Sequence, residues 1–260
     1  KEKTLMSKLR VFSPSYNSHK FCVNCIDSVA SQTMLPYEHF FIDDVSQDDT
    51  RDWLSSHYER IQNNTKDKYK LTVVLNPSRK WKLLNLYEYV IKCDPEDVIC
   101  VLDGDDWLAD SSVLEKIWEN YQDPNVDYVY TNWKFSHSGE EGISKQIPET
   151  DDWNPYSSPW VTSALSTFRA KQFLKIPIIN FFRWDYKWFT MGCDQAYVLP
   201  ILHQIMRENE GQRKIKFIDQ PLYVYQFTEN PNKPRTQNDG GMRMDAHDSV
   251  TFIRSRGYIK

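Results

Sequence analysis

Apolar residues follow two different periods in the first half of the chain. Short apolar runs are typical of buried strands, and they predict strands at 9–13, 39–42, 71–75 and 98–102. Between these runs, apolar residues return at helical spacing, which predicts helices at 18–32, 52–61 and 81–91. Ser112 and Glu115 have the spacing of a capping box, so another helix is expected to begin there.

Strands that alternate with helices along a chain are joined by right-handed crossovers. The expected fold class is therefore α/β, with a largely parallel sheet and flanking helices. The run at 98–102 is apolar throughout, which indicates a strand buried on both faces. Beyond Tyr130 the pattern loosens, and it predicts an excursion over the sheet edge at 133–160. Short strands are expected at 164–169 and 217–219, and a helix, kinked by its proline, at 193–207.

Polar residues follow each of the four predicted strands. They are Ser13 to Ser15, Asp43 with Asp44, Asn76, and the run from Asp103 to Asp106. In an open parallel sheet the carboxyl ends of the strands share one edge, and ligands bind in the crevice there. We therefore expect these side chains to converge on one site.

Chain length, net charge and cysteine content limit the kinds of fold, partner and cellular setting that are expected. The 260 residues fit a single domain, and a net charge of −4 does not favour nucleic acid or an anionic membrane as a partner. No apolar run is long enough to span a bilayer, and the first residues lack the apolar segment of a signal peptide. Five cysteines, an odd number, favour a reducing, cytoplasmic setting, although a longer parent chain with a targeting segment stays open. Cys22 and Cys25 are interpreted as part of a packed helix face, not as a metal or redox site.

The run Asp103-Gly104-Asp105-Asp106 carries the strongest chemical signal. Three carboxylates within four residues repel one another unless a cation lies among them, and hard oxygen ligands suit Mn²⁺ or Mg²⁺. Gly104 would let the backbone approach a ligand closely. The alternative is an acidic turn before a helix. A calcium-binding EF-hand does not fit, because Leu108 stands where that loop needs glycine.

Three segments together resemble the inverting family 2 glycosyltransferases of the GT-A fold. The first comprises residues 12–17, 26–32 and 41–49, the second is the DGDDWL run, and the third comprises 191–194 and 217–225. The resemblance implies a single GT-A domain over 1–260, with a nucleotide-binding half at 9–130 and an acceptor-binding half at 131–260. It also implies metal-dependent transfer of a hexose from a nucleotide diphosphate sugar, more frequently a UDP-sugar, to a glycan or other hydroxyl-bearing acceptor.

The resemblance assigns roles position by position. Pro14 and Tyr16 would line the nucleobase pocket, and Asp44 would accept a hydrogen bond from uracil. Asp103 would contact the ribose, Asp105 would bind the metal, and Asp106 would hold the loop or touch the sugar. Either Lys80 or Lys82 would supply the cation that contacts the base. Asp194 stands where the family has its general base, with Cys193 in place of the usual Glu.

Two prolines and two glycines predict a mobile loop at 228–241, and Lys233 and Arg235 are expected to order over the diphosphate when it closes. Nine tryptophans are expected to serve mainly in packing, with one or two stacking on sugar rings. Two other functions stay open. A nucleotidyltransferase or hydrolase could use the same carboxylate–metal edge, and a catalytically silent module could bind a nucleotide-sugar without turnover.

Overall fold

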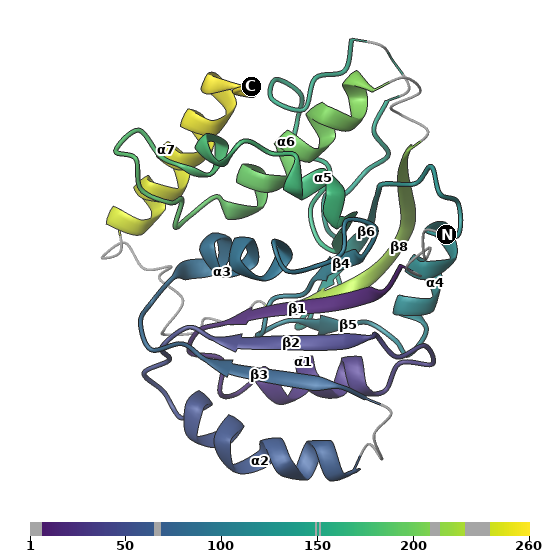
Figure 1. The fold of residues 1–260 in the computed structure, drawn as a ribbon, viewed down its shortest axis with the longest axis vertical. Helices are drawn as coiled ribbons and strands as arrows, with labels where there is room; N and C mark the ends of the chain where they lie inside the picture. Colours follow the sequence, from purple (N-terminus) through teal and green to yellow (C-terminus); the bar gives the residue numbers. More distant parts are fainter. Residues whose placement is uncertain (1–6, 65–68, 149, 151, 209–213, 227–239) are drawn as a thin grey trace, which may run out of the picture.

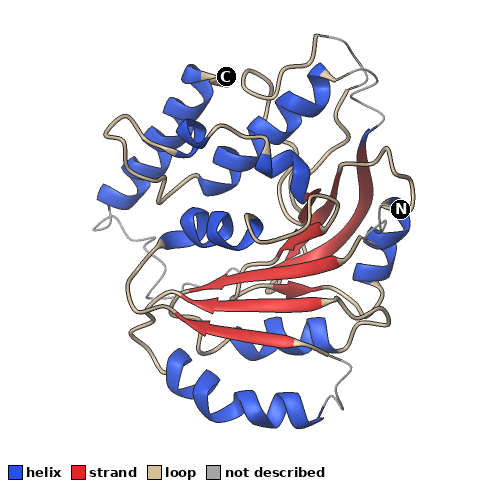
Figure 2. Cartoon of the chain, viewed as in Figure 1, coloured by secondary structure: helices blue, strands red, loops and turns tan. Residues whose placement is uncertain are grey.

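An eight-stranded mixed sheet runs through the computed structural model, which describes residues 7–64, 69–148, 150, 152–208, 214–226 and 240–260 (Figures 1 and 2). Its strands are β1 (Leu9–Ser15), β2 (Glu38–Asp43), β3 (Leu71–Leu75), β4 (Val98–Val101), β5 (Trp107–Leu108), β6 (Tyr128–Phe135), β7 (Ser166–Arg169) and β8 (Ile215–Tyr225). Their order across the sheet is β3-β2-β1-β4-β7-β6-β8-β5. Strands β1 to β4, β6 and β8 run in one direction, and β5 and β7 run antiparallel to their neighbours. The predicted mainly parallel α/β sheet is confirmed.

Helices cover both faces of this sheet (Figure 1). They are α1 (Cys22–Ala30), α2 (Thr50–Asn64), α3 (Trp81–Val90), α4 (Val113–Asn120), α5 (Ala170–Leu174), the 3₁₀ helix η1 (Ile178–Phe181), α6 (Cys193–Arg207) and α7 (Gly240–Arg256). Buried residues of α1, α2 and α4 form one core with the sheet, and those of α3, α5 and α6 form the other. None of the helices in the described ranges is long and apolar enough to cross a membrane.

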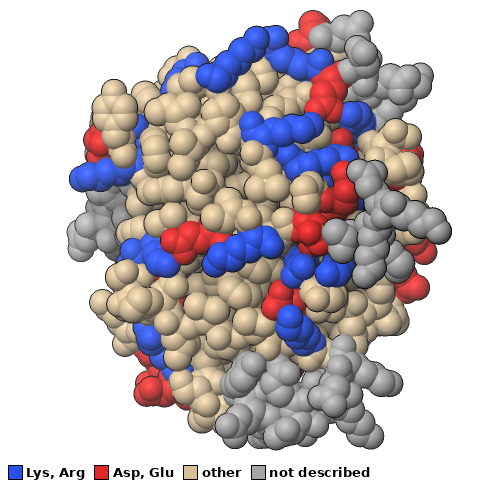
Figure 3. Space-filling view, in the orientation of Figure 1, with Lys and Arg blue, Asp and Glu red and all other residues tan. Residues whose placement is uncertain are grey.

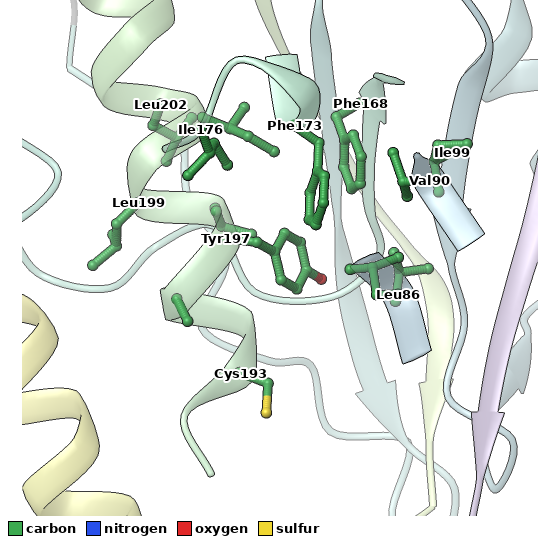
Figure 4. Close-up of a cluster of buried hydrophobic side chains, with 14 of the residues drawn as sticks. Leu86, Val90, Ile99, Phe168, Phe173, Ile176, Cys193, Tyr197, Leu199 and Leu202 are labelled. Atoms are coloured by element: carbon green, nitrogen blue, oxygen red, sulfur yellow. The ribbon is translucent and has the colours of Figure 1, made fainter. Parts of the chain in front are cut away.

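Strand β4 explains why two cores form. Val98 and Cys100 contribute to the core beside α1, whereas Ile99 and Val101 contribute to the core beside α3. Because successive side chains of a strand point to opposite faces, a strand that is apolar throughout needs a cover on each face. Figure 4 shows the second core, in which Phe173, Phe168 and Tyr197 gather between α6 and the sheet. The predicted burial of this strand on both faces is confirmed.

The second half of the chain is more regular than its sequence pattern predicted. Strand β6 continues to Phe135, and β8 extends far beyond the expected 217–219. The two pair in parallel, with register shifts around Asn132 where Pro221 interrupts the ladder. This partner is distant in the sequence, so the local pattern could not reveal it. Helix α7 was not predicted either.

The predicted capping box is wrong in its side-chain contacts, although the helix begins where expected. Ser112 stands at the N-cap of α4, but its hydroxyl donates to Asp110 at 2.6 Å and makes no cap bond. Glu115 instead accepts a hydrogen bond from Thr33 at 2.9 Å. Asp110 lies two residues before Ser112 and offers a charged acceptor within reach, and such local partners compete with the backbone for a serine hydroxyl.

Charged side chains of both signs are interspersed on the described part of the face seen in Figure 3. This distribution accords with the small net charge of −4. Cys22 and Cys25 are fully buried free thiols on the inner face of α1, where burial raises the pKa of Cys22 to about 12. The predicted packed helix face is confirmed by this burial.

Candidate active site

The polar ends of the first four strands lie side by side, as predicted. The amide of Asp44 donates to the carbonyl of Ser15 at 2.8 Å, and the amide of Asn76 donates to the carbonyl of Asp43 at 2.9 Å. On the other side of β1, the amide of Gly104 donates to the carbonyl of Pro14 at 2.9 Å. These bonds continue the parallel ladders past the strand ends, and they bring the carboxylates after β2 and β4 to one edge.

Gly104 is required by the close approach of this turn to β1. A Cβ at this position would lie 2.6 Å from the Cβ of Ser15 and 3.1 Å from the ring of Phe41. Neither neighbour can move easily, because Ser15 is held in β1 by its pairing with Asp43 of β2, and Phe41 is fully buried. The glycine therefore keeps the acidic run against the end of β1.

Asp44 is buried and holds the start of α3. Its carboxylate accepts hydrogen bonds from the backbone amides of Lys80 at 2.9 Å and Trp81 at 2.7 Å, and from the Asn76 side chain at 2.8 Å. The first amides of a helix have no partner within the helix, so a carboxylate from a neighbouring strand end can satisfy them. Asp44 thus fixes α3 against β2, a contact that the sequence did not indicate.

Arg79 is a site residue that the sequence analysis missed. Its guanidinium lies 3.2 Å from the centre of the Tyr16 ring and 4.1 Å from that of Trp81, and its Nε is 3.7 Å from Asp44. Lys80 turns instead to Glu88 at 2.7 Å. Arg79 directly precedes Lys80, one of the two predicted lysines, but only the fold reveals which cation faces Tyr16 and Asp44.

Strained backbone is concentrated at this end of the sheet. Val45 has a φ of 66° and Trp81 a φ of 65°, values that β-branched and aromatic residues rarely adopt. Val45 directly follows Asp44 in the chain, and the amide of Trp81 donates one of the hydrogen bonds to Asp44. Such outliers persist only where surrounding contacts enforce them, and they cluster at ligand sites. The strain therefore supports the assignment of a binding site here.

Lys82 connects two carboxylates from distant parts of the chain. Its Nζ is 2.8 Å from Asp103, after β4, and 2.7 Å from Asp194, in the first turn of α6. Burial opposes the charge of Lys82, but the two carboxylates outweigh it and raise its pKa well above the usual value. Burial also raises the pKa of Asp103, with Lys82 opposing this effect and Asp194 adding to it. The Tyr197 hydroxyl donates to Asp194 at 3.3 Å.

A cavity of about 400 Å³ opens beside this ion-pair triad. Lys82, Asp103 and Asp194 form part of its lining. Six aromatic side chains also line it: Trp133, Phe135, Trp160, Tyr197, Tyr223 and Tyr225. Its volume falls in the range of ~300–1,000 Å³ that is typical of small-molecule sites, which are mainly apolar with a few polar groups.

Asp106 and Asp105 differ in their surroundings. Asp106 is buried, accepts a hydrogen bond from the hydroxyl of Tyr223, and accepts another from the amide of Gln226 at 2.6 Å. It therefore fastens the end of β8 to the acidic turn. Asp105 is half-buried in the same turn. Of the described residues, no cluster of three or more His, Cys, Asp or Glu side chains could hold a metal ion.

The remaining predicted site residues fall in two groups. Pro14 and Tyr16 lie at the end of β1, with Tyr16 against Arg79. Lys233 and Arg235 lie outside the described residues, as does the predicted loop at 228–241 apart from Gly240 and Gly241, which begin α7.

Comparison with known families gives a match over most of the chain. The family model described as glycosyl transferase family 2 matches residues 11–190. This range includes both strand-end aspartates and the acidic run, and it ends just before α6. No curated protein sequence matches significantly.

Solved structures with a similar fold are glycosyltransferases of low sequence identity. TarS of S. aureus has a TM-score of 0.61 at 15% identity, over 95% of this chain and 40% of that chain. The mannosyltransferase PcManGT of Pyrobaculum calidifontis, in complex with GDP-Man and Mn²⁺, has a TM-score of 0.58 at 17% identity, over 87% and 59%. Glucosyl-3-phosphoglycerate synthase of Mycobacterium tuberculosis, in complex with Mn²⁺, UDP and phosphoglyceric acid, has a TM-score of 0.57 at 14% identity, over 98% and 80%. The chain thus has the GT-A fold and spans 40% of the TarS chain.

Proposed function

The chain belongs to glycosyl transferase family 2, and we propose that it is a glycosyltransferase that transfers a hexose from a UDP-sugar to an acceptor hydroxyl with inversion. The observation that carries this proposal is the triad of Asp103, Lys82 and Asp194 beside the cavity. It joins the acidic turn, where a nucleotide diphosphate would bind, to a carboxylate that faces the space for an acceptor. Inversion is carried over from the family resemblance.

The base-binding end of the donor site would comprise Asp44, Arg79, Tyr16 and Pro14. Asp44 would accept a hydrogen bond from the uracil N–H, and Arg79 would contact the base in place of Lys80. Support comes from the position of the Arg79 guanidinium against Tyr16 and 3.7 Å from Asp44. Lys82 would act at the sugar end, because its ammonium is within 3 Å of both carboxylates there. UDP is the proposed donor nucleotide, since TarS has been solved with UDP-GlcNAc.

A divalent cation, Mn²⁺ or Mg²⁺, would be held at the acidic turn when the donor is bound. The described residues supply no complete set of protein ligands, whereas Mg²⁺ and similar ions commonly combine one or two carboxylates with phosphate oxygens. Asp105 would hold the cation, next to Asp103, whose pKa is raised mainly by burial and further by the carboxylates of Asp194 and Asp105. When bound, the cation would neutralise charge on the leaving diphosphate. Lys233 and Arg235 are proposed to contribute further positive charge there.

Asp194 is the proposed general base. It would accept the proton of the acceptor hydroxyl as that oxygen attacks the anomeric carbon, which requires the carboxylate to be ionised. The Lys82 ammonium contacts this carboxylate at 2.7 Å, and Asp194 stands in the first turn of α6. The donation from Tyr197 would help to orient the carboxylate.

The test is a panel of nucleotide-sugars incubated with the protein and Mn²⁺, with products identified by mass spectrometry and the anomeric configuration followed by NMR. Release of UDP with transfer to an acceptor or to water, and with inverted configuration, is expected. Release of a nucleoside monophosphate would instead indicate the nucleotidyltransferase or hydrolase alternative. Tight UDP-sugar binding without turnover by any donor would indicate a silent module. The cytoplasmic location and the division into nucleotide and acceptor halves stay predictions.

A further inference from the structure

The lining of the cavity beside Asp194 combines an aromatic surface with an unfavourable charge balance for anions. Among its described lining residues, Lys82 is the one Lys or Arg, against the two carboxylates of Asp103 and Asp194. Lys82 is within 3 Å of both of these carboxylates. An acceptor that carries a phosphate or carboxylate would therefore meet two carboxylates, and the one described lining cation is already paired with both of them.

The walls of this cavity offer apolar aromatic contacts. Trp133 and Phe135 on β6, Tyr223 and Tyr225 on β8, and Trp160 surround the cavity. Trp133, Phe135 and Tyr225 already pack edge to face on one another, at centroid distances of 4.7 Å to 6.0 Å. Trp160 is half-buried, and none of the described aromatic rings pairs with it. Trp160 also packs against the core that includes α6, and an indole in a cavity wall can receive the apolar C–H face of a sugar ring.

Polar groups at the same cavity suit the hydroxyls of such a ring. Thr162, Ser163 and Tyr197 line it, and each carries a hydroxyl that can donate or accept a hydrogen bond. The cavity thus combines neutral hydrogen-bonding groups, an aromatic surface and an excess of carboxylates. This combination suits an uncharged polyhydroxylated ring.

We propose that the acceptor is an uncharged glycoside, and that its terminal sugar ring stacks on Trp160 with the attacking hydroxyl at Asp194. This inference rests on the proposed function and deepens it by naming the acceptor class. The proposed acceptor differs in charge from phosphoglyceric acid, the anionic compound with which the M. tuberculosis synthase of similar fold was solved.

The first experiment measures equilibrium binding of matched sugars to the protein loaded with UDP and Mn²⁺. The neutral probes are maltose, cellobiose and lactose, and the anionic probes are glucose 6-phosphate and glucuronic acid. At least one neutral probe is expected to bind about tenfold or more tightly than either anionic probe, the size of one well-placed interaction. Equal or tighter binding of the anionic probes would overturn the proposal.

A pair of variants tests the stacking contact. Trp160→Ala is expected to weaken binding of the preferred neutral sugar about tenfold and to leave UDP affinity unchanged. The control is Trp118→Ala, since Trp118 is a partly buried tryptophan on α4 outside this cavity, and it is expected to leave sugar binding unchanged. An unchanged sugar affinity in Trp160→Ala, or a loss of UDP affinity instead, would reject the acceptor role. Failure of the glycosyltransferase proposal itself would appear separately, as absent donor turnover with sugar binding retained.

Discussion

Asp194 is the residue on which the proposed chemistry depends. Asp194→Asn keeps the size of the side chain but cannot accept a proton at neutral pH, so kcat is expected to fall by ~10²–10⁴-fold. Donor Kd and melting temperature should change little, because the carboxylate is about half exposed and Asn is tolerated at a helix start. Steady-state kinetics, donor titration and thermal melts on one preparation measure all three.

The control for this variant is Asp185→Asn, which removes a comparable surface carboxylate that pairs with Arg183 at 3.4 Å. It should leave kcat unchanged. If Asp194→Asn keeps turnover within about threefold of the parent, far short of a general-base effect, the base lies elsewhere.

Lys82 tests whether the triad acts as a unit. In Lys82→Gln the two carboxylates lose their shared cation, and the pKa of Asp103 should rise further because burial and Asp194 still act on it. The acidic limb of kcat/KM is then expected to move to higher pH. Lys82→Arg should retain most of the parent profile. Lys80→Gln, which breaks only the contact with Glu88, is the matched control on the same helix. A profile of Lys82→Gln that superimposes on the parent would refute the coupling.

His39 predicts how stability depends on pH. Burial lowers its pKa to about 3, while its ring nitrogens contact Ser13 and Tyr69. In the unfolded chain His39 has its ordinary pKa of ~6.5, so below that pH the unfolded chain binds a proton that the folded protein does not. The stability that is present above pH ~6.5 is therefore lost progressively as the pH falls toward about 3. The slope from this residue approaches ~1.4 kcal/mol per pH unit. Urea unfolding between pH 7 and 4.5 should show a shallower slope for His39→Gln than for the parent, and parallel curves would contradict the assignment.

At the scale of elements, the start of α3 couples the fold to the nucleobase site. Asp44→Ala removes a carboxylate that accepts the first amides of α3, at an expected cost of ~0.5–2 kcal/mol in the free energy of unfolding. It should also weaken UDP binding by ~1–3 kcal/mol through loss of a charge-assisted hydrogen bond. Urea unfolding and UDP titration measure the two effects.

Asp44→Asn separates these two roles. The amide oxygen of Asn can still accept from the helix, so stability should recover in part, whereas one of the two acceptor oxygens becomes a donor and UDP affinity should stay low. Asp52→Ala, in the first turn of α2, is the control at another helix start. Full UDP affinity in Asp44→Asn would move the base-binding contact away from Asp44.

At the scale of the whole molecule, donor binding should stabilise the fold only when a cation is present. UDP at about 100 times its Kd would raise the free energy of unfolding by ~2.7 kcal/mol with Mn²⁺, and EDTA should remove most of that gain. Asp105→Ala should abolish the Mn²⁺-dependent part, and the free variant should still fold. Glu119→Ala, an exposed acid of α4, serves as the control. A normal Mn²⁺-dependent shift in Asp105→Ala would exclude Asp105 as the metal ligand.

The sequence by itself determined the first half of the fold and the family. Strands β1 to β4 and helices α1 to α3 form from patterns within a few residues, because burial on one or both faces dictates the spacing of apolar side chains. The polar motifs that follow the strands can likewise be recognised from a few neighbouring residues. The family match over 11–190 confirms the resemblance.

Only the tertiary structure decided how distant residues meet. Lys82 bridges Asp103 and Asp194, which are 91 positions apart in the numbering, and Arg79 rather than Lys80 faces Tyr16. The long β6–β8 pairing, which supplies aromatic walls to the cavity, also joins segments far apart in the chain. Such contacts depend on strand order and helix packing, and neither is encoded in the spacing of neighbouring residues. A sequence pattern therefore predicts which groups end a strand, while the packed fold decides which of them share a proton, a cation or a ligand.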